Sequence, residues 1–129
     1  MGQRFNVNND VDTTLVTVAE TVVATLTGVY LQRIGQGVRL HGQFNITTGG
    51  STTAVTARIR RDSLVGALVG EATADQIEAA AGSTEDHDIV RTDFPPGELA
   101  NATYVLTVQQ TAAAANGTVL NASLEATTD

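Results

Sequence analysis

The chain from Val38 to Ile46 reads V-R-L-H-G-Q-F-N-I and alternates apolar with polar residues almost without fault. Successive side chains of a pleated strand point to opposite faces, so Val38 and Leu40 share one face while Arg39 and His41 share the other. The same alternation returns in three further segments, V-T-A-R-I-R at 55–60, Y-V-L-T-V at 104–108 and L-N-A-S-L-E-A at 120–126. The pattern predicts half-buried antiparallel strands, with one face in a core and the other in water.

The composition predicts one folded domain with an aliphatic core. The chain has 129 residues, enough to bury a core without disulfides, and 42% of them are hydrophobic. Only 4% are aromatic and Trp is absent, so Val, Leu, Ile and Ala must fill the core. We expect residues 1–12, which are polar and rich in Asn, to form an N-terminal arm, and residues 13–129 to form a β-sandwich domain.

Turn signals divide the chain into about eight strands with little helix. Gly49-Gly50 predicts a tight hairpin between the strands at 38–47 and 53–61, because glycine readily adopts the positive φ values of such turns. The segment 64–72 is ambiguous between strand and short helix, and only 74–81 has a helical composition. Further strands are expected at 15–18, 21–31, 86–92, 103–111 and 118–127. Their spacing predicts an all-β, single-domain antiparallel β-sandwich that is jelly-roll-like.

Charge and hydropathy limit the possible partners. The formal net charge is −7 at pH 7, and all seven basic residues are Arg. We therefore predict no nucleic-acid partner. No apolar run approaches the roughly 18 residues of a membrane span, so we predict no membrane partner. The N-terminal residues lack the apolar core of a secretory signal, and we expect the chain to be made in the cytoplasm of its host.

The residues needed for catalysis are scarce. The absence of Cys excludes disulfides and thiolate metal sites, and no G-x-S-x-G motif is present. His41 and His87 stand 46 positions apart, outside any metal-ligand spacing. The acidic run E-D-H-D at 85–88 cannot converge on one ion, because consecutive strand residues point to opposite faces. We predict no enzymatic activity and no catalytic, cofactor-binding or metal-binding residues.

Three arginines are expected to form one basic patch. Arg58 and Arg60 share the outward face of their strand, and Arg39 is outward on the strand predicted to pair with it. Neighbouring guanidinium groups repel each other unless carboxylates lie close to them. Pairing within the chain is the favoured interpretation, and an acidic neighbour in an assembly is the alternative.

A second set of outward residues is apolar. Val16, Val23, Val105 and Val119 fall out of phase with the inward residues of their strands. They are either ordinary surface valines or residues that bury against identical subunits, and we favour the second interpretation slightly.

Four segments, taken together, resemble small structural proteins of tailed-phage virions, such as capsid decoration proteins and head fibre modules. They read E-T-V-V-A-T-L at 20–26, G-V-R-L-H-G-Q-F-N-I-T-T-G-G-S-T-T-A-V-T-A-R-I-R-R at 37–61, A-T-Y-V-L-T-V-Q-Q-T at 102–111 and G-T-V-L-N-A-S-L-E-A at 117–126. The resemblance covers most of the chain beyond the arm. It implies a homotrimer of jelly rolls in the virion, without a cofactor, that binds the major capsid protein or another virion protein.

On this interpretation the chain is a capsid decoration (cement) protein that stabilises the lattice through binding alone. Phe5 and Val7 on the arm, together with Arg39, Arg58 and Arg60, are the candidate contact residues. The alternative is a carbohydrate- or receptor-binding β-sandwich module of a fibre or cell surface, against which the absence of Trp counts. A main shell protein and a hydrolase on the same fold are further alternatives.

Overall fold

The structure is a computed structural model that describes residues 3–9, 11–31, 35–47, 53–73, 84–95 and 101–128. Its elements are β1 (Arg4–Asn9), β2 (Thr13–Thr14), β3 (Thr21–Val29), β4 (Val38–Thr47), β5 (Val55–Arg61), β6 (Leu68–Thr73), β7 (Thr84–Asp93), β8 (Ala102–Gln110), the 3-10 helix η1 (Ala113–Ala115) and β9 (Thr118–Thr128). No helix in these ranges is long and apolar enough to cross a membrane. The helical segment predicted at 74–81 lies outside the described residues.

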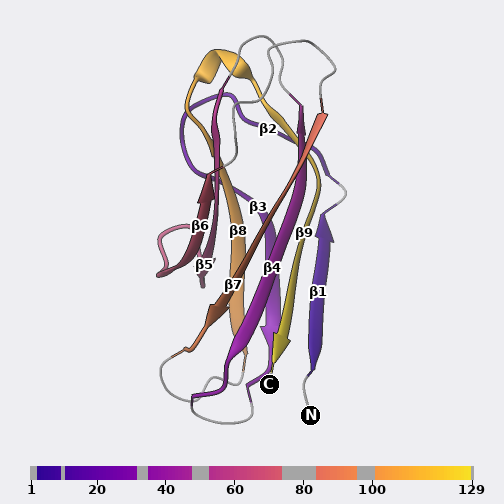
Figure 1. Cartoon of the computed structure of the whole chain (residues 1–129), viewed down its shortest axis with the longest axis vertical. Coiled ribbons are helices and arrows are strands. Elements are labelled where there is room, and N and C mark those ends of the chain that lie inside the picture. The colour runs from indigo at the N-terminus through magenta and orange to yellow at the C-terminus, as the bar shows by residue number, and fades with distance from the viewer. Residues whose placement is uncertain are drawn as a thin grey trace.

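The strands form two antiparallel sheets that pack face to face (Figure 1). Sheet A has the order β1-β9-β4-β7, with β2 also paired to β9, and sheet B has the order β3-β8-β5-β6. Among the eight longer strands of the described ranges, only β5 and β6 follow each other along the chain within one sheet. This is the strand order of a jelly roll, and it confirms the predicted single-domain β-sandwich.

Two expectations about individual strands are wrong. Strand β4 lies between β9 and β7 in sheet A, whereas β5 lies between β8 and β6 in sheet B, so they do not form a hairpin. A Gly-Gly pair permits a reversal but does not fix which strand pairs with which, and here each strand has two other neighbours. The strand expected at 15–18 is absent from this described part of the chain, where only Thr13 and Thr14 pair with β9.

Residues 4–9, expected to belong to an arm, form the edge strand β1 of sheet A. Arg4 lies opposite Thr127 on β9, and the Thr128 amide donates a 2.8 Å hydrogen bond to the Gln3 carbonyl. Strand β1 begins and β9 ends at the same end of the sandwich (Figure 1). Phe5 is half-buried and packs against the hydrophobic core, so this segment is held by its own domain.

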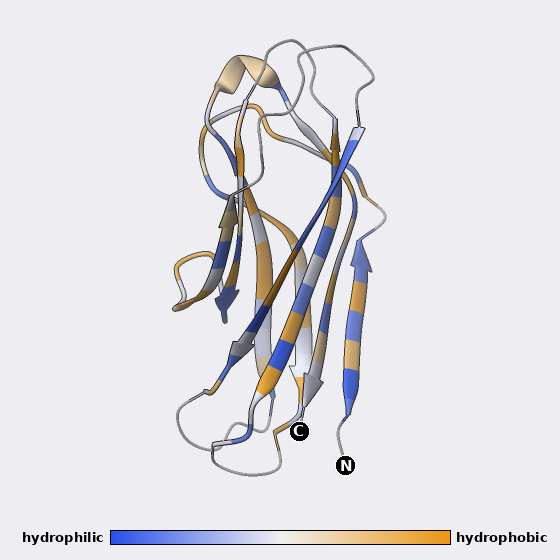
Figure 2. Cartoon of the chain, viewed as in Figure 1, coloured by the Kyte–Doolittle hydropathy of each residue, from blue (hydrophilic) through white to orange (hydrophobic). Residues whose placement is uncertain are grey.

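The core lies between the sheets and is aliphatic, as predicted. On β4, Val38, Leu40, Phe44 and Ile46 are buried in the predicted phase, and the alternation is visible along this strand in Figure 2. Gly42 belongs to the same inward set, since a Cβ there would lie 2.9 Å from a Leu106 methyl carbon.

Three of the four valines predicted to face outward are buried. Val16 is exposed, but Val23, Val105 and Val119 are buried. At Val119 the strand changes phase, because Asn121 has a φ of 53° where the pairing with β4 shifts register. A comparable shift occurs between Val22 and Ala24 on β3. One extra residue in a strand reverses which side chains face the core.

A buried ion pair connects the two sheets. Asp93, at the end of β7 and 7% exposed, accepts hydrogen bonds from Arg61 Nε at 3.0 Å and Arg61 Nη2 at 2.6 Å. The Tyr104 hydroxyl on β8 donates to Asp93 Oδ2 at 2.8 Å. Burial and this carboxylate raise the pKa of Tyr104 well above its usual value, so its hydroxyl remains a donor.

Candidate functional site

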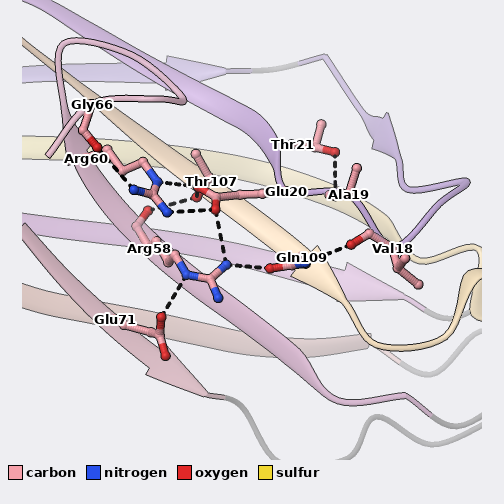
Figure 3. Close-up of polar contacts among 10 residues, drawn as sticks. All are labelled: Val18, Ala19, Glu20, Thr21, Arg58, Arg60, Gly66, Glu71, Thr107 and Gln109. Carbon is pink, nitrogen blue, oxygen red and sulfur yellow. Dashed lines mark hydrogen bonds and ion pairs between the residues drawn. The ribbon is translucent and has the colours of Figure 1, made fainter. Parts of the chain in front are cut away.

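The outer face of sheet B carries a polar cluster centred on Glu20, the residue before β3 (Figure 3). Its carboxylate accepts hydrogen bonds from Arg60 Nε at 2.6 Å and Arg60 Nη2 at 3.0 Å. It also accepts from the Thr107 hydroxyl at 2.7 Å and from Arg58 Nη1 at 3.3 Å. One carboxylate thereby joins two neighbouring strands, β5 and β8, to the segment that precedes β3.

Arg58 extends the cluster in two further directions. Its Nε donates to Glu71 Oε2 on β6 at 2.7 Å, and its Nη1 donates to Gln109 Oε1 on β8 at 2.6 Å. The Gln109 amide in turn donates to the Val18 carbonyl at 2.8 Å. Two guanidinium groups therefore meet two carboxylates within the chain, which confirms the favoured interpretation of Arg58 and Arg60.

The side chains of the cluster cover part of the outer face of β8 and bury residues there. Thr107 is completely buried beneath it, and Val105 is buried next to it although both belong to the outward phase of the strand. The hydrogen bond from Arg60 is the largest cause that lowers the pKa of Glu20. The Thr107 hydroxyl and the charges of Arg60 and Arg58 lower this pKa further, whereas burial acts in the opposite direction and raises it. Glu20 is therefore ionised at neutral pH and raises the pKa of Arg60 in return.

We expect the stability contributed by Glu20 to depend on pH. Because its folded pKa lies below its ordinary value of 4.5, this stability is complete above pH 4.5 and is lost as pH falls through the folded pKa. Glu20→Gln should lower the free energy of unfolding by about 1 kcal/mol at pH 7, since the amide oxygen still accepts a hydrogen bond. The difference in the free energy of unfolding between the parent chain and Glu20→Gln, measured by urea unfolding, should be smaller at pH 3 than at pH 7.

The matched control is Asp86→Asn, which also removes one carboxylate but from an exposed position on β7. If E20Q lowered the free energy of unfolding by the same amount at pH 7 and at pH 3, the ionised carboxylate would have no role in stability.

An apolar hairpin projects from the edge of the same sheet. The loop between β5 and β6, residues 62–67, and the first residue of β6 expose three aliphatic side chains, with Leu64 40%, Val65 92% and Leu68 51% exposed. We call residues 62–68 the apolar hairpin. The residue pattern at 64–72 is ambiguous between strand and helix, and its one signal for this surface is an apolar run directly after the turn at Asp62 and Ser63.

Hydrogen bonds fix the shape of the apolar hairpin. The Arg61 amide donates to the Ala67 carbonyl at 2.9 Å, and the Gly66 amide donates to the Ser63 carbonyl at 2.9 Å. Arg60 Nη1 donates to the Gly66 carbonyl at 3.1 Å, which ties the apolar hairpin to the Glu20 cluster (Figure 3). The exposed side chains are thus presented by a backbone that the rest of the domain holds in place.

The other predicted contact residues lie elsewhere. Arg39 is on the outer face of sheet A, opposite Thr92 and Thr127, so the predicted patch of Arg39 with Arg58 and Arg60 is not formed. The reason is that β4 and β5 belong to different sheets. Phe5 and Val7 pack against the core from β1, so they are engaged within the domain.

The acidic run at 85–88 divides between the two faces of β7. Asp88 lies 3.4 Å from His41 Nε2, whereas Glu85 lies 3.4 Å from His87 Nε2. Within the described ranges, no three residues among His, Asp and Glu gather as they would around a metal ion.

No protein-family model and no curated protein matches this chain. Solved structures do match it. A chain of the T13 viral particle of infectious bursal disease virus aligns with 98% of this chain and 31% of its own length, at 10% identity and a TM-score of 0.57. Dimeric latent PorU from Porphyromonas gingivalis aligns with 99% of this chain and 13% of its own, at 9% identity and a TM-score of 0.55.

A third match comes from the disulfide-linked pili of Bacillus endospore appendages. It covers 98% of this chain and 86% of the pilus chain, at 17% identity and a TM-score of 0.47. This chain spans less than a third of the viral protein and of PorU. At these identities the similarity is one of fold, a small all-β sandwich that also occurs in a viral particle.

Proposed function

We propose that this chain is a non-enzymatic structural protein of a virion, most specifically a capsid decoration protein that binds the capsid lattice as a homo-oligomer. The apolar hairpin is the observation that carries the proposal. A protein that acts by attachment needs an exposed, preformed surface, and Leu64, Val65 and Leu68 provide one. The jelly-roll strand order and the fold similarity to a viral-particle chain support the same class of protein.

The apolar hairpin would supply part of the binding energy. Full burial of an exposed aliphatic side chain contributes about 1.5–3 kcal/mol, less for the half-exposed Leu64 and Leu68, and a backbone that is already ordered loses little entropy on contact. Because the Glu20 cluster neutralises Arg58 and Arg60, the surface beside the apolar hairpin can be covered without leaving an unpaired charge. Each bound copy would then favour the intact lattice by mass action.

Light scattering at several protein concentrations tests the homo-oligomer, and cosedimentation with capsids of its own virus tests attachment. We expect the parent chain to form a stable trimer and to sediment with capsids. Val65→Asp should weaken one or both associations by about tenfold or more, because it places a charge in a contact that excludes water.

Val11→Asp is the matched control, since Val11 is 73% exposed but lies outside the apolar hairpin. A parent chain that remained monomeric and did not bind capsids would contradict the proposed function. If Val11→Asp weakened association as much as Val65→Asp, the apolar hairpin would not be the attachment surface.

A further inference from the structure

A hollow of about 280 Å³ opens on the outer face of sheet A, away from the apolar hairpin. We call it the sheet A pocket, and it is lined by Arg4, Arg39, His41, Glu125 and Thr127. These residues come from three adjacent strands, β1, β9 and β4, and the strand register sets their positions. Arg4, Thr127 and Arg39 form one row across the strands, and Glu125 and His41 lie side by side in the next row.

Arg39 differs from the other arginines in its surroundings. Within the described ranges, its guanidinium has no carboxylate or carbonyl partner. The exposed Arg4 is paired with Glu125, with 3.5 Å between Nε and Oε1. The remaining described arginines all bond to carboxylate or carbonyl oxygens, namely Arg58, Arg60, Arg61 and Arg91.

The charges of the sheet A pocket favour an anion. Two guanidinium groups flank Thr127 with one carboxylate beside them, so the lining residues are net positive in a chain of net charge −7, and the Asp88 carboxylate lies outside the lining beside His41. Arg4 and Arg39 lie on either side of Thr127, two strand spacings or about 10 Å apart, so their long side chains can approach one bound group from opposite sides. A guanidinium binds a carboxylate through two parallel hydrogen bonds, and Arg39 is free to do so.

The pocket also offers groups that suit hydroxyls. Glu125 can accept hydrogen bonds from them, and Thr127 can donate or accept. His41 contributes its ring to the wall, and its Nε2 atom lies 3.4 Å from an Asp88 carboxylate oxygen without forming a hydrogen bond to it. A volume of about 280 Å³ is close to the lower end for small-molecule sites, roughly 300 Å³, and suits a single sugar ring.

We infer that the sheet A pocket binds an acidic sugar unit, with the sugar carboxylate on Arg39 and sugar hydroxyls on Glu125 and Thr127. The inference does not depend on the proposed attachment function, because it uses the other sheet and a different set of residues.

Nuclear magnetic resonance titration of the full chain with glucuronate tests this assignment, with glucose, acetate and inorganic phosphate as comparison ligands. Glucuronate should shift the amide signals of Glu125 and Thr127 and bind more tightly than any of the other three. Arg39→Gln should weaken glucuronate binding by about tenfold or more, because it removes the charge-assisted pair. Arg91→Gln, a substitution of equal charge on β7, should leave it unchanged.

Each comparison can overturn the inference. Equal binding of glucose would show that the carboxylate is not recognised, and equal binding of acetate would show that the hydroxyls are not. Equal binding of phosphate would reduce the pocket to a general anion site. If glucuronate did not bind and Arg39→Gln instead changed the oligomeric state in light scattering, the pocket would be part of a subunit contact.

Discussion

Replacing Asp93 with alanine is expected to lower the free energy of unfolding by about 3–5 kcal/mol, because it leaves Arg61 partly buried without a counter-charge. Asp93 is 7% exposed, and its carboxylate accepts three hydrogen bonds, two from Arg61 and one from Tyr104. The loss is large for a second reason, since Asp93 is on sheet A while both donors are on sheet B. Urea unfolding at pH 7 measures the effect.

Two further variants make this prediction specific. Asp88→Ala removes a carboxylate from the same strand, but that side chain is 65% exposed, so stability should change by no more than about 0.5 kcal/mol. Tyr104→Phe deletes one neutral donor and leaves the ion pair, and should cost about 1 kcal/mol. A loss below 1 kcal/mol for D93A would show that the ion pair contributes little to joining the sheets.

Gly66→Ala is expected to destabilise the domain by about 3 kcal/mol, the upper end for an added methyl group. The new Cβ would overlap the carbonyl oxygen of Arg61 and lie 2.9 Å from its carbonyl carbon and 3.1 Å from the Ser63 carbonyl oxygen. All three are backbone atoms, so no change of rotamer relieves the contact, and the apolar hairpin must change shape.

Hydrogen exchange at the Gly66 and Asp62 amides would show the change directly, because both amides are hydrogen-bonded in the parent chain. Ser63→Ala, an exposed substitution within the same apolar hairpin, should leave exchange and stability nearly unchanged. If G66A unfolded at the parent's urea concentration and kept this protection, the described shape of the apolar hairpin would be wrong. Val65→Asp is expected to weaken association. If G66A weakened it too, attachment would depend on the backbone shape of the apolar hairpin as well as on its exposed apolar side chains.

The sequence was sufficient for the fold class and for the strongest strand. The alternation at 38–46 predicts β4 and its buried face correctly, because each of its inward residues meets the core without interruption. It fails at Val119 and Val23, where a shift in register reverses the phase, and a bulge such as that at Asn121 has no fixed sequence signature. It fails at Val105, which is buried on the outer face of β8 opposite Arg60 of the Glu20 cluster.

The candidate site was predicted in part for similar reasons. Alternation alone placed Arg58 and Arg60 on one face, and their crowding indicated nearby carboxylates. Glu20 could not be identified, because it lies 38 and 40 residues away along the chain and carries no local motif. Arg39 was assigned to the wrong surface because the choice of strand partner is a long-range property that a turn sequence does not determine.

The pairing of β1 with β9 also determines how the domain responds to mechanical load. Gln3 and Thr128 lie side by side, and the two strands run antiparallel away from them. A force that pulls these two residues apart would load one hydrogen bond at a time, in the manner of a zipper, rather than shearing the whole ladder at once. Tension applied at this end of the sandwich would therefore peel off β1 at low force, whereas the buried pairs of β4 with β7 and β9 would not bear the load until later.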